Sequence, residues 1–372
     1  YLDAATDAAV AVAYGQLQSG GWTNSVDFDP ASPHAAAYRN GKGRGKNNSS
    51  LDDGQTQSAL RLMIHVDHAL AFKNKVIHDS ATVGLDALLN AQYPNGGFPQ
   101  VWEGPVEPQS TVRANYPEYD WRTEGRIKNY WDMYTLNDNV TGYVADTLID
   151  AASIYRDNRY SDALRKLGDF LLLAQMPEPQ PAWAQQYNYA MQPIWARKFE
   201  PPGVSGDETQ EVLDTLMKIY RVTGDRKYLE PIPPALAWLK RPVLQDGQVA
   251  RYYELRTNRP LYMSRRGDAY SLTYDDSDLP SHYGWKSASR VDDIESQYHN
   301  LLANRTTAQP EPDEQAVRQV VDGLDGEGRW VSTFDGERLV GQAKIPIGAK
   351  YLSSQVFSDN LATLSGFLKS RE

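Results

Sequence analysis

The sequence predicts a predominantly all-α fold, an α/α toroid of helix pairs with long loops and a few short strands on one rim. Three observations predict it. Apolar residues recur at spacings of three and four in seven successive segments, the ends of several segments resemble one another, and the connections alternate between short and long. We expect a single domain over residues 1–372, with an irregular, loop-rich region at about 245–350.

The helical spacing extends over most of the first 240 residues. Helices are expected near residues 3–17, 55–71, 75–91, 139–156, 160–174, 207–222 and 229–240. Beyond residue 240 the pattern weakens. Alternating, tyrosine-rich residues at 249–263 predict a short hairpin. Two further helices are expected, near 287–303 and 352–370.

The ends of the helices repeat a short pattern. AYGQLQSGGWTN at 13–24 resembles LNAQYPNGGFPQ at 89–100, and LLAQMPEPQPAWAQQ at 172–186 is a looser copy. Each copy has a glutamine near a helix end, then a turn rich in glycine or proline, then an aromatic residue. The copies indicate a repeated unit of two helices and a long loop.

Long and short connections alternate along the chain. The long ones are at about 18–54, 92–138 and 175–207. Between antiparallel helices, strict alternation brings every long loop to the same end of the fold. We expect function at that loop-rich rim, where the inner helices begin.

Composition excludes several classes of function. The chain has no cysteine, which rules out disulfides, thiolate metal ligands and a cysteine nucleophile. Its net charge of −10 argues against nucleic-acid binding. No run of about 18 apolar residues predicts a transmembrane helix. We find no P-loop and no G-x-G-x-x-G or G-x-S-x-G motif, and His65 and His68 lack the pattern of a zinc site.

Acidic residues precede three of the predicted helices: Asp52 and Asp53, Asp138, and Asp207. One interpretation is purely structural, because Asp is a preferred helix N-cap and favours the positive end of the helix dipole. The toroid, however, would bring these helix starts together, and several carboxylates in one place repel one another. Ca²⁺ would remove that repulsion, since it tolerates an irregular oxygen cage better than Mg²⁺ does. The acids are therefore candidates for caps or for a Ca²⁺ site.

Arginines occur in the same loop-rich regions: Arg197 in WARKFEPP, Arg251 in ARYYE and Arg265 in MSRRGD. Scattered surface arginines are the simpler interpretation. Arg197 and Arg251 nevertheless lie beside aromatic residues and three positions before an acid. We expect Glu200 and Glu254 to hold the two guanidinium groups. Oriented arginines and Ca²⁺ ligands on one rim would suit a carboxylated sugar polymer.

Five segments appear in an order similar to that of the pectate lyases of polysaccharide lyase family 10. They are LDDGQT at 51–56, QYPNGGFPQ at 92–100, LNDN at 136–139, WARKFEPP at 195–202 and YELRTNRPLYMSRRGD at 253–268. The resemblance covers roughly residues 10–270. It implies an α/α toroid with a long groove and calcium-dependent cleavage of polygalacturonate by anti β-elimination. The products would be 4,5-unsaturated oligogalacturonides.

The resemblance also implies roles for the acidic residues. Asp52 and Asp138 match the two aspartates that bind Ca²⁺ in the family. Asp53 stands where the family usually has asparagine, at a position that we assign to substrate binding. Its additional charge is expected to change the affinity for Ca²⁺.

Arg197 matches the arginine that acts as the base on the C5 proton, and Arg251 and Arg265 match arginines that bind galacturonate carboxylates. An arginine is an awkward base because its pKa lies above about 12. Partial burial, neighbouring Ca²⁺ and other arginines are expected to lower the pKa of Arg197. An alkaline optimum would follow.

Two other functions remain open from the residues alone. An α/α-toroid glycoside hydrolase would use paired carboxylates among Asp52, Asp138 and Asp207. A non-catalytic polygalacturonate-binding protein would keep the arginine contacts but would not need Arg197.

The first residue is Tyr1 rather than Met, which predicts a removed secretion signal. We expect a monomer, secreted by a bacterium or held in its periplasm. Its partner would be polygalacturonate, without nucleic acid or membrane.

Overall fold

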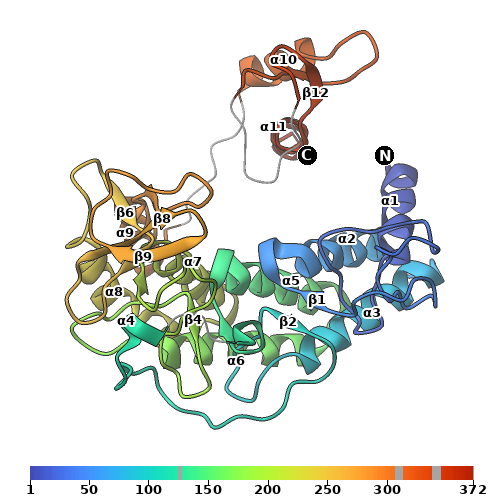
Figure 1. Ribbon diagram of the computed structural model, residues 1–372. Helices are drawn as coiled ribbons and strands as arrows, with labels where there is room; N and C mark the ends of the chain where they lie inside the picture. The colour runs from blue at the N-terminus through green and yellow to red at the C-terminus, as the bar shows by residue number, and fades with distance from the viewer. Residues whose placement is uncertain (125–127, 306–312, 337–344, 372) are drawn as a thin grey trace. The chain divides into compact units, whose positions relative to one another are not determined.

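The computed structural model describes residues 1–124, 128–305, 313–336 and 345–371. As predicted, the fold is mostly helical with short strands, an α/α toroid (Figure 1). Contacts divide the chain into two compact units, Tyr1–Leu301 and Leu302–Glu372. This division differs from the single domain expected over 1–372. The reason is that the elements of the second unit pack on one another, α10 (Glu314–Asp322) on α11 (Ser354–Lys369).

Three helices form the inner layer of the first unit. α2 (Gln55–Ala69) packs on α5 (Val140–Tyr155), and α5 packs on α7 (Gly206–Thr223). Their fully buried residues recur at helical spacing, as in Leu60, Met63 and Ile64 of α2. The turns before α2 and α5 contact each other, and the turn before α5 contacts α7. The starts of the inner helices therefore meet on one rim, as the alternating loops predicted.

The outer layer pairs with these helices through short links, except for its first helix, which a long loop joins to α2. It consists of α1 (Leu2–Tyr14), α3 (Lys75–Asn90), α6 (Asn158–Ala174) and α8 (Ile232–Leu239), with the 3-10 turn η4 (Arg226–Leu229) before α8. α3 packs on α2, α6 on α5, and α8 on α7. Side-chain caps begin two outer helices: Asn74 caps α3 and Asp157 caps α6.

The glutamine of each repeated helix end joins two outer helices. Its side-chain amide donates one hydrogen bond to the turn that follows and another to a carbonyl in or just before the next outer helix. The acceptors are Gly20 and Ser80 for Gln16, Gly96 and Ala163 for Gln92, and Pro181 and Pro231 for Gln175, at 2.8–3.0 Å. The repeat seen in the sequence therefore links α1 to α3, α3 to α6, and α6 to the start of α8.

Short strands join the long loops to one another. β1 (Ser49–Ser50) pairs with β2 (Val101–Trp102), β3 (Tyr134–Thr135) with β4 (Gln186–Tyr187), β6 (Gln248–Ala250) with β10 (Lys286–Ala288), and in the second unit β11 (Val331–Thr333) with β12 (Lys350–Leu352). The largest sheet has the order β5 (Val204–Ser205), β7 (Tyr252–Tyr253), β8 (Pro260–Arg266) and β9 (Ala269–Thr273), all antiparallel. The hairpin predicted at 249–263 is confirmed in β7 and β8, and the sheet continues into β9.

The remaining helices lie in the second half of the chain or in loops. α9 (Val291–Leu302) and α11 confirm the helices expected near 287–303 and 352–370, whereas α10 was not foreseen. α4 (Trp121–Glu124) and the 3-10 turn η2 (Tyr130–Asp132) are short turns within a long loop. No helix among the described residues is both long and apolar enough to cross a membrane.

Candidate active site

Two 3-10 turns lead into the inner helices: η1 (Asp52–Gly54) before α2, and η3 (Asn137–Asn139) before α5. In both turns the second and third residues have left-handed backbone conformations, with φ between 48° and 70°. Asp, Asn and Gly adopt this conformation most readily, which explains the residue types. By position in the turn, Asp53 is equivalent to Asp138, and Asp52 is equivalent to Asn137.

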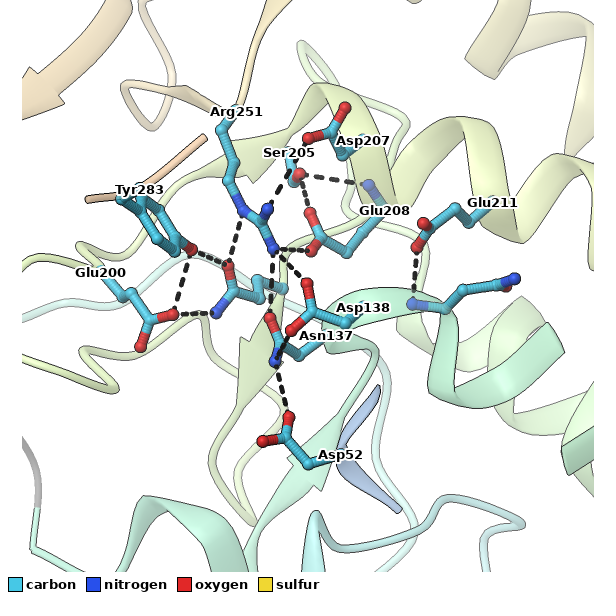
Figure 2. Close-up of polar contacts among 12 residues, drawn as sticks. Asp52, Asn137, Asp138, Glu200, Ser205, Asp207, Glu208, Glu211, Arg251 and Tyr283 are labelled. Carbon is cyan, nitrogen blue, oxygen red and sulfur yellow. Dashed lines mark hydrogen bonds and ion pairs between the residues drawn. The ribbon is translucent and has the colours of Figure 1, made fainter. Parts of the chain in front are cut away.

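Asp52 and Asp138 do not cap the helices that follow them. Neither α2 nor α5 has a side-chain cap at its N-terminus. Asp52 Oδ1 instead accepts hydrogen bonds from Gln100 Nε2 at 2.7 Å and from Asn137 Nδ2 at 3.3 Å. Asn137 Nδ2 also donates to Asp138 Oδ2 at 2.6 Å. The capping interpretation is wrong for both residues. Their carboxylates do not bind the helix N–H groups, and both accept from the side-chain amide of Asn137 instead (Figure 2).

Asp207 is not a cap either. α7 is capped by Ser205, whose hydroxyl accepts a hydrogen bond from the backbone N–H of Glu208 at 3.2 Å. Asp207 lies in the first turn of the helix and accepts a hydrogen bond from the hydroxyl of Ser287. None of the three predicted cap positions therefore serves as one.

Asp52, Asp53 and Asp138 together fit a metal ion. Each offers a carboxylate oxygen, and the three oxygens lie within 4.8 Å of one another. Burial raises the pKa of Asp52 above its usual value, and the charges of Asp53 and Asp138 add to this, against the hydrogen bond from Gln100. A half-buried carboxylate with two further carboxylates close beside it suits a hard divalent cation. The structure places Asp53 beside the two predicted Ca²⁺ ligands.

Arg251 is held by acids from two inner helix starts. Its side chain is only 11% exposed, and Nη2 lies 2.9 Å from Asp138 Oδ1, 3.0 Å from Glu208 Oε1 and 3.2 Å from Asn137 Oδ1 (Figure 2). The prediction that Glu254 would hold Arg251 is wrong, because Arg122 binds the Glu254 carboxylate at 2.6 Å. The segment from Arg251 into β7 is extended, and residues three apart in an extended strand point to opposite faces.

Arg197 and Glu200 form the pair that was predicted. Arg197 Nε and Nη2 donate to the two carboxylate oxygens at 2.8 and 2.6 Å, and the backbone N–H of Arg197 donates to Oε2 at 2.8 Å. Glu200 is buried, whereas the side chain of Arg197 is 45% exposed. Burial lowers the pKa of Arg197, but the contacts with Glu200 outweigh it and raise the pKa above its usual value. The protein's own groups therefore do not provide the lowering that we expected.

Tyr283 and Gln185 connect the two arginines. The ring centroid of Tyr283 lies 5.6 Å from the guanidinium carbon of Arg197 and 4.9 Å from that of Arg251. The Tyr283 hydroxyl donates to Glu200 Oε1 at 3.0 Å. Gln185 Nε2 donates to the same oxygen at 3.1 Å, and its Oε1 accepts from Arg251 Nε at 3.4 Å. The two guanidinium groups therefore share two neighbours, Tyr283 and Gln185.

Sequence reasoning missed two acids in the first turns of α7, the buried Glu208 and the half-buried Glu211. Burial raises the pKa of Glu208 to about 7, although Arg251 opposes this. Burial, followed by the charges of Glu208 and Asp207, raises the pKa of Glu211 to about 9, although its carboxylate accepts the Asn139 N–H at 2.9 Å. The available signal was the run GDETQE, which adds acids to a predicted inner helix start.

Arg265 lies apart from this network, on strand β8. Its Nε donates to Gly267 O at 2.7 Å, and its side chain is 41% exposed. It still lies close to the site. Burial is the main cause that lowers the pKa of His282, and the charges of Arg265, Arg197 and Lys198 lower it further, so all three cations are near this histidine. The structure therefore brings together five of the six predicted site residues and places Arg265 on the adjoining hairpin.

Comparison with known proteins identifies the family. The profile of the pectic acid lyase family matches residues 16–250, more than half of the chain. The chain belongs to the pectic acid lyase family. The matched segment contains Asp52, Asp53, Asp138 and Arg197 and ends one residue before Arg251. The predicted resemblance to a pectate lyase is confirmed.

Two solved structures share the fold of this lyase. One is a mutant family 10 polysaccharide lyase from Cellvibrio cellulosa in complex with trigalacturonic acid, at 21% identity and a TM-score of 0.59, covering 82% of this chain and 96% of that one. The other is a family 10 polysaccharide lyase from Cellvibrio cellulosa, at 22% identity and a TM-score of 0.58, covering 82% of this chain and 94% of that one. No curated protein sequence matches significantly.

Proposed function

We propose that the chain is a calcium-dependent pectate lyase that cleaves α-1,4-polygalacturonate by β-elimination, with Arg197 as the base. One observation carries the proposal: in a chain of the pectic acid lyase family, the carboxylates of Asp52, Asp53 and Asp138 lie within 4.8 Å of one another on the rim that also presents Arg197. The trigalacturonic acid bound by a protein of the same fold supports the choice of substrate.

Asp52 and Asp138 would hold Ca²⁺, with Asp53 beside them. Bound there, Ca²⁺ supplies positive charge to a uronate carboxylate and so makes the adjacent C5 proton more acidic. The chain's own residues prepare the position: Gln100 and Asn137 fix the Asp52 carboxylate by hydrogen bonds at 2.7 and 3.3 Å. Asp53, as an acid in place of the family's usual asparagine, adds negative charge that favours cation binding.

Arg197 is positioned by Glu200 to receive the C5 proton. Glu200 binds Nε and Nη2, so Nη1 is the guanidinium nitrogen that no described residue engages by hydrogen bond. In the elimination, the C5 proton moves to Nη1. The electron pair of the C5–H bond forms the C4–C5 double bond, and the bond from C4 to the leaving oxygen breaks. That oxygen takes a proton from water. Glu200 raises the pKa of Arg197 and so disfavours its neutral base form, which gains population only as the pH rises into the alkaline range.

Family membership favours this function over the two alternatives. A hydrolase requires two carboxyl groups on either side of the scissile bond, about 5–5.5 Å or 6.5–9.5 Å apart. The carboxylates of Asp52 and Asp138 instead lie close together beside that of Asp53, and the Asp207 carboxylate accepts a hydrogen bond from Ser287. A non-catalytic binding protein would not need Arg197 as a base, and membership of the pectic acid lyase family favours catalysis.

The test is an assay on polygalacturonate with and without chelator. We expect products that absorb near the ultraviolet edge, because elimination creates a double bond and hydrolysis does not. Chelation should stop the reaction, and Ca²⁺ should restore it better than Mg²⁺, which requires a tight octahedral site. Reducing ends without ultraviolet absorbance would overturn the proposal in favour of hydrolysis. Full activity after chelation would remove the metal from it.

A further inference from the structure

A second cationic cavity lies beneath the β8–β9 hairpin, outside the network of Arg197 and Arg251. Its volume is about 450 Å³, and its lining includes Arg122, Trp195, Lys198, Met263, Tyr270 and Leu272. The size is sufficient for one sugar ring with its substituents. Every one of these residues belongs to the same compact unit as the active site.

The register of the hairpin places Arg265 on the cavity side. Met263 is opposite Leu272, and Arg265 is opposite Tyr270. Directly opposed side chains of antiparallel strands share a face, and residues two apart on one strand do so as well. Arg265 therefore continues the face that lines the cavity, and its guanidinium carbon lies 5.5 Å from the centroid of the Tyr270 ring.

Lys198 is a cation without a carboxylate. Its Nζ donates to the backbone carbonyl of Asp268 at 2.9 Å and lies 5.2 Å from the centroid of the Tyr270 ring. No ion pair to Lys198 occurs within the described part of the chain, although the protein has a net charge of −10. The contact of Arg265 with the Asp268 carboxylate is long, at 3.6 Å, and that carboxylate is 96% exposed. Lys198 thus has no carboxylate partner among the described residues and Arg265 has only a long, exposed one, so both cations can take up an anion.

The other cavity residues supply shape. Arg122 is neutralised by Glu254 at 2.6 Å and stacks on Trp121, with its guanidinium carbon 4.6 Å from the ring centroid. Trp195 is buried, and its Nε1 donates to Trp121 O at 2.6 Å, which fixes the ring. Aromatic walls with free cations at the edge are the surroundings that a carboxylated sugar requires.

We propose that this cavity is a further galacturonate-binding site, in which Lys198 binds the carboxylate of a residue distant from the bond that is cleaved. Lys198 directly follows Arg197 in the chain, so one polymer bound at the base has neighbouring residues within reach of the cavity. The inference rests on the proposed function and extends it to long substrates. Arg265, on the hairpin face that continues the cavity lining, would serve the same polymer.

The experiment compares Lys198→Ala with wild type on galacturonate oligomers of increasing length and on polygalacturonate. Lys73→Ala is the matched control, since Lys73 is an exposed lysine in the short link between α2 and α3. We expect kcat/KM of Lys198→Ala on the polymer to fall about tenfold, mainly through KM, as for the loss of one charge-assisted hydrogen bond. The loss should shrink as the oligomer shortens. Lys198→Arg should retain most of the affinity.

Two results would overturn the inference. An equal loss at every chain length would place Lys198 at the reacting residue rather than at a distant one, and no loss on the polymer would remove it from binding. The carboxylate bound in the cavity could also come from free galacturonate. If the cavity binds the free sugar rather than the polymer, added galacturonate will inhibit lyase activity only in wild type and not in Lys198→Ala. A wild-type protein without unsaturated product would instead contradict the proposed function, so the two failures are distinguishable.

Discussion

Arg197 and Arg251 pack against the same aromatic ring, that of Tyr283, with centroid distances of 5.6 and 4.9 Å. Each guanidinium group is otherwise held by different acids: Arg197 by Glu200, and Arg251 by Asp138 and Glu208. The ring therefore fixes the spacing between the proposed base and a proposed carboxylate-binding arginine.

Replacing Tyr283 should separate the contributions of its ring and its hydroxyl. Tyr283→Phe keeps the ring and loses the hydroxyl contacts with Glu200 and Tyr252. Tyr283→Leu loses these contacts and also both cation–π contacts, each worth about 0.5–2 kcal/mol. We expect Tyr283→Leu to lose about tenfold or more in kcat/KM and Tyr283→Phe clearly less. Steady-state kinetics on polygalacturonate would measure both, with a thermal melt to confirm folding. Equal losses in the two variants would deny the ring a positioning role.

Asp52→Ala and Asp138→Ala should each cost far more activity than stability. As Ca²⁺ ligands both would lower turnover by orders of magnitude. In calcium-free buffer Asp52→Ala relieves repulsion among the three carboxylates, whereas Asp138→Ala also removes one acidic partner of the buried Arg251 and should cost some stability. Asn74→Ala is the control, because Asn74 is a side-chain cap of α3. It should lose about 0.5–2 kcal/mol of stability and keep its turnover. Melts in chelator and rates in saturating Ca²⁺ would test this; a large loss of stability with normal rates in Asp52→Ala would contradict it.

Glu200→Gln should move the pH dependence of kcat. Glu200 raises the pKa of Arg197, so removing its charge should lower that pKa, and the rising limb of the profile should shift to lower pH. Glu254→Gln is the control, since it removes a buried acid paired with a different arginine, Arg122. If Arg197 acts only as a fixed positive charge, kcat will fall in Glu200→Gln without a shift of the limb.

Glu211 should make the calcium-free protein less stable as pH rises. Its pKa is about 9 in the folded protein against a usual value of 4.5, so its contribution is fully present below 4.5 and is lost as pH rises through 9. Glu211→Gln keeps an acceptor for the Asn139 N–H and removes the titration. Between pH 7 and 9, denaturant unfolding should show a decline in wild type that is smaller in the variant. Parallel curves would mean that Glu211 does not titrate in this range.

The sequence predicted the helices well because their apolar spacing is long and regular, and it placed the inner helix starts on one rim because the loops alternate. It also pointed to Asp52 and Asp138, although their capping could be excluded only when the turns were seen. Tertiary contacts decided the rest. Arg251 turned to Asp138 and Glu208 rather than Glu254 because an extended strand separates residues three apart. No pattern in the sequence marked the boundary at Leu301, after which the chain forms a separate compact unit.

The glutamine links of the outer layer determine where this fold can vary. Gln16 and Gln175 fix the points at which two long loops leave the helices. Further along each loop, a hydroxyl at an inner helix start accepts a hydrogen bond from a backbone N–H of the loop. Thr56 accepts the Trp22 N–H at 3.0 Å, and Thr209 accepts the Trp183 N–H at 3.2 Å. Length added to a loop beyond these anchors leaves the helix pairs and the acidic turns in place. Groove depth and the number of sugars bound can therefore evolve independently of the reaction centre.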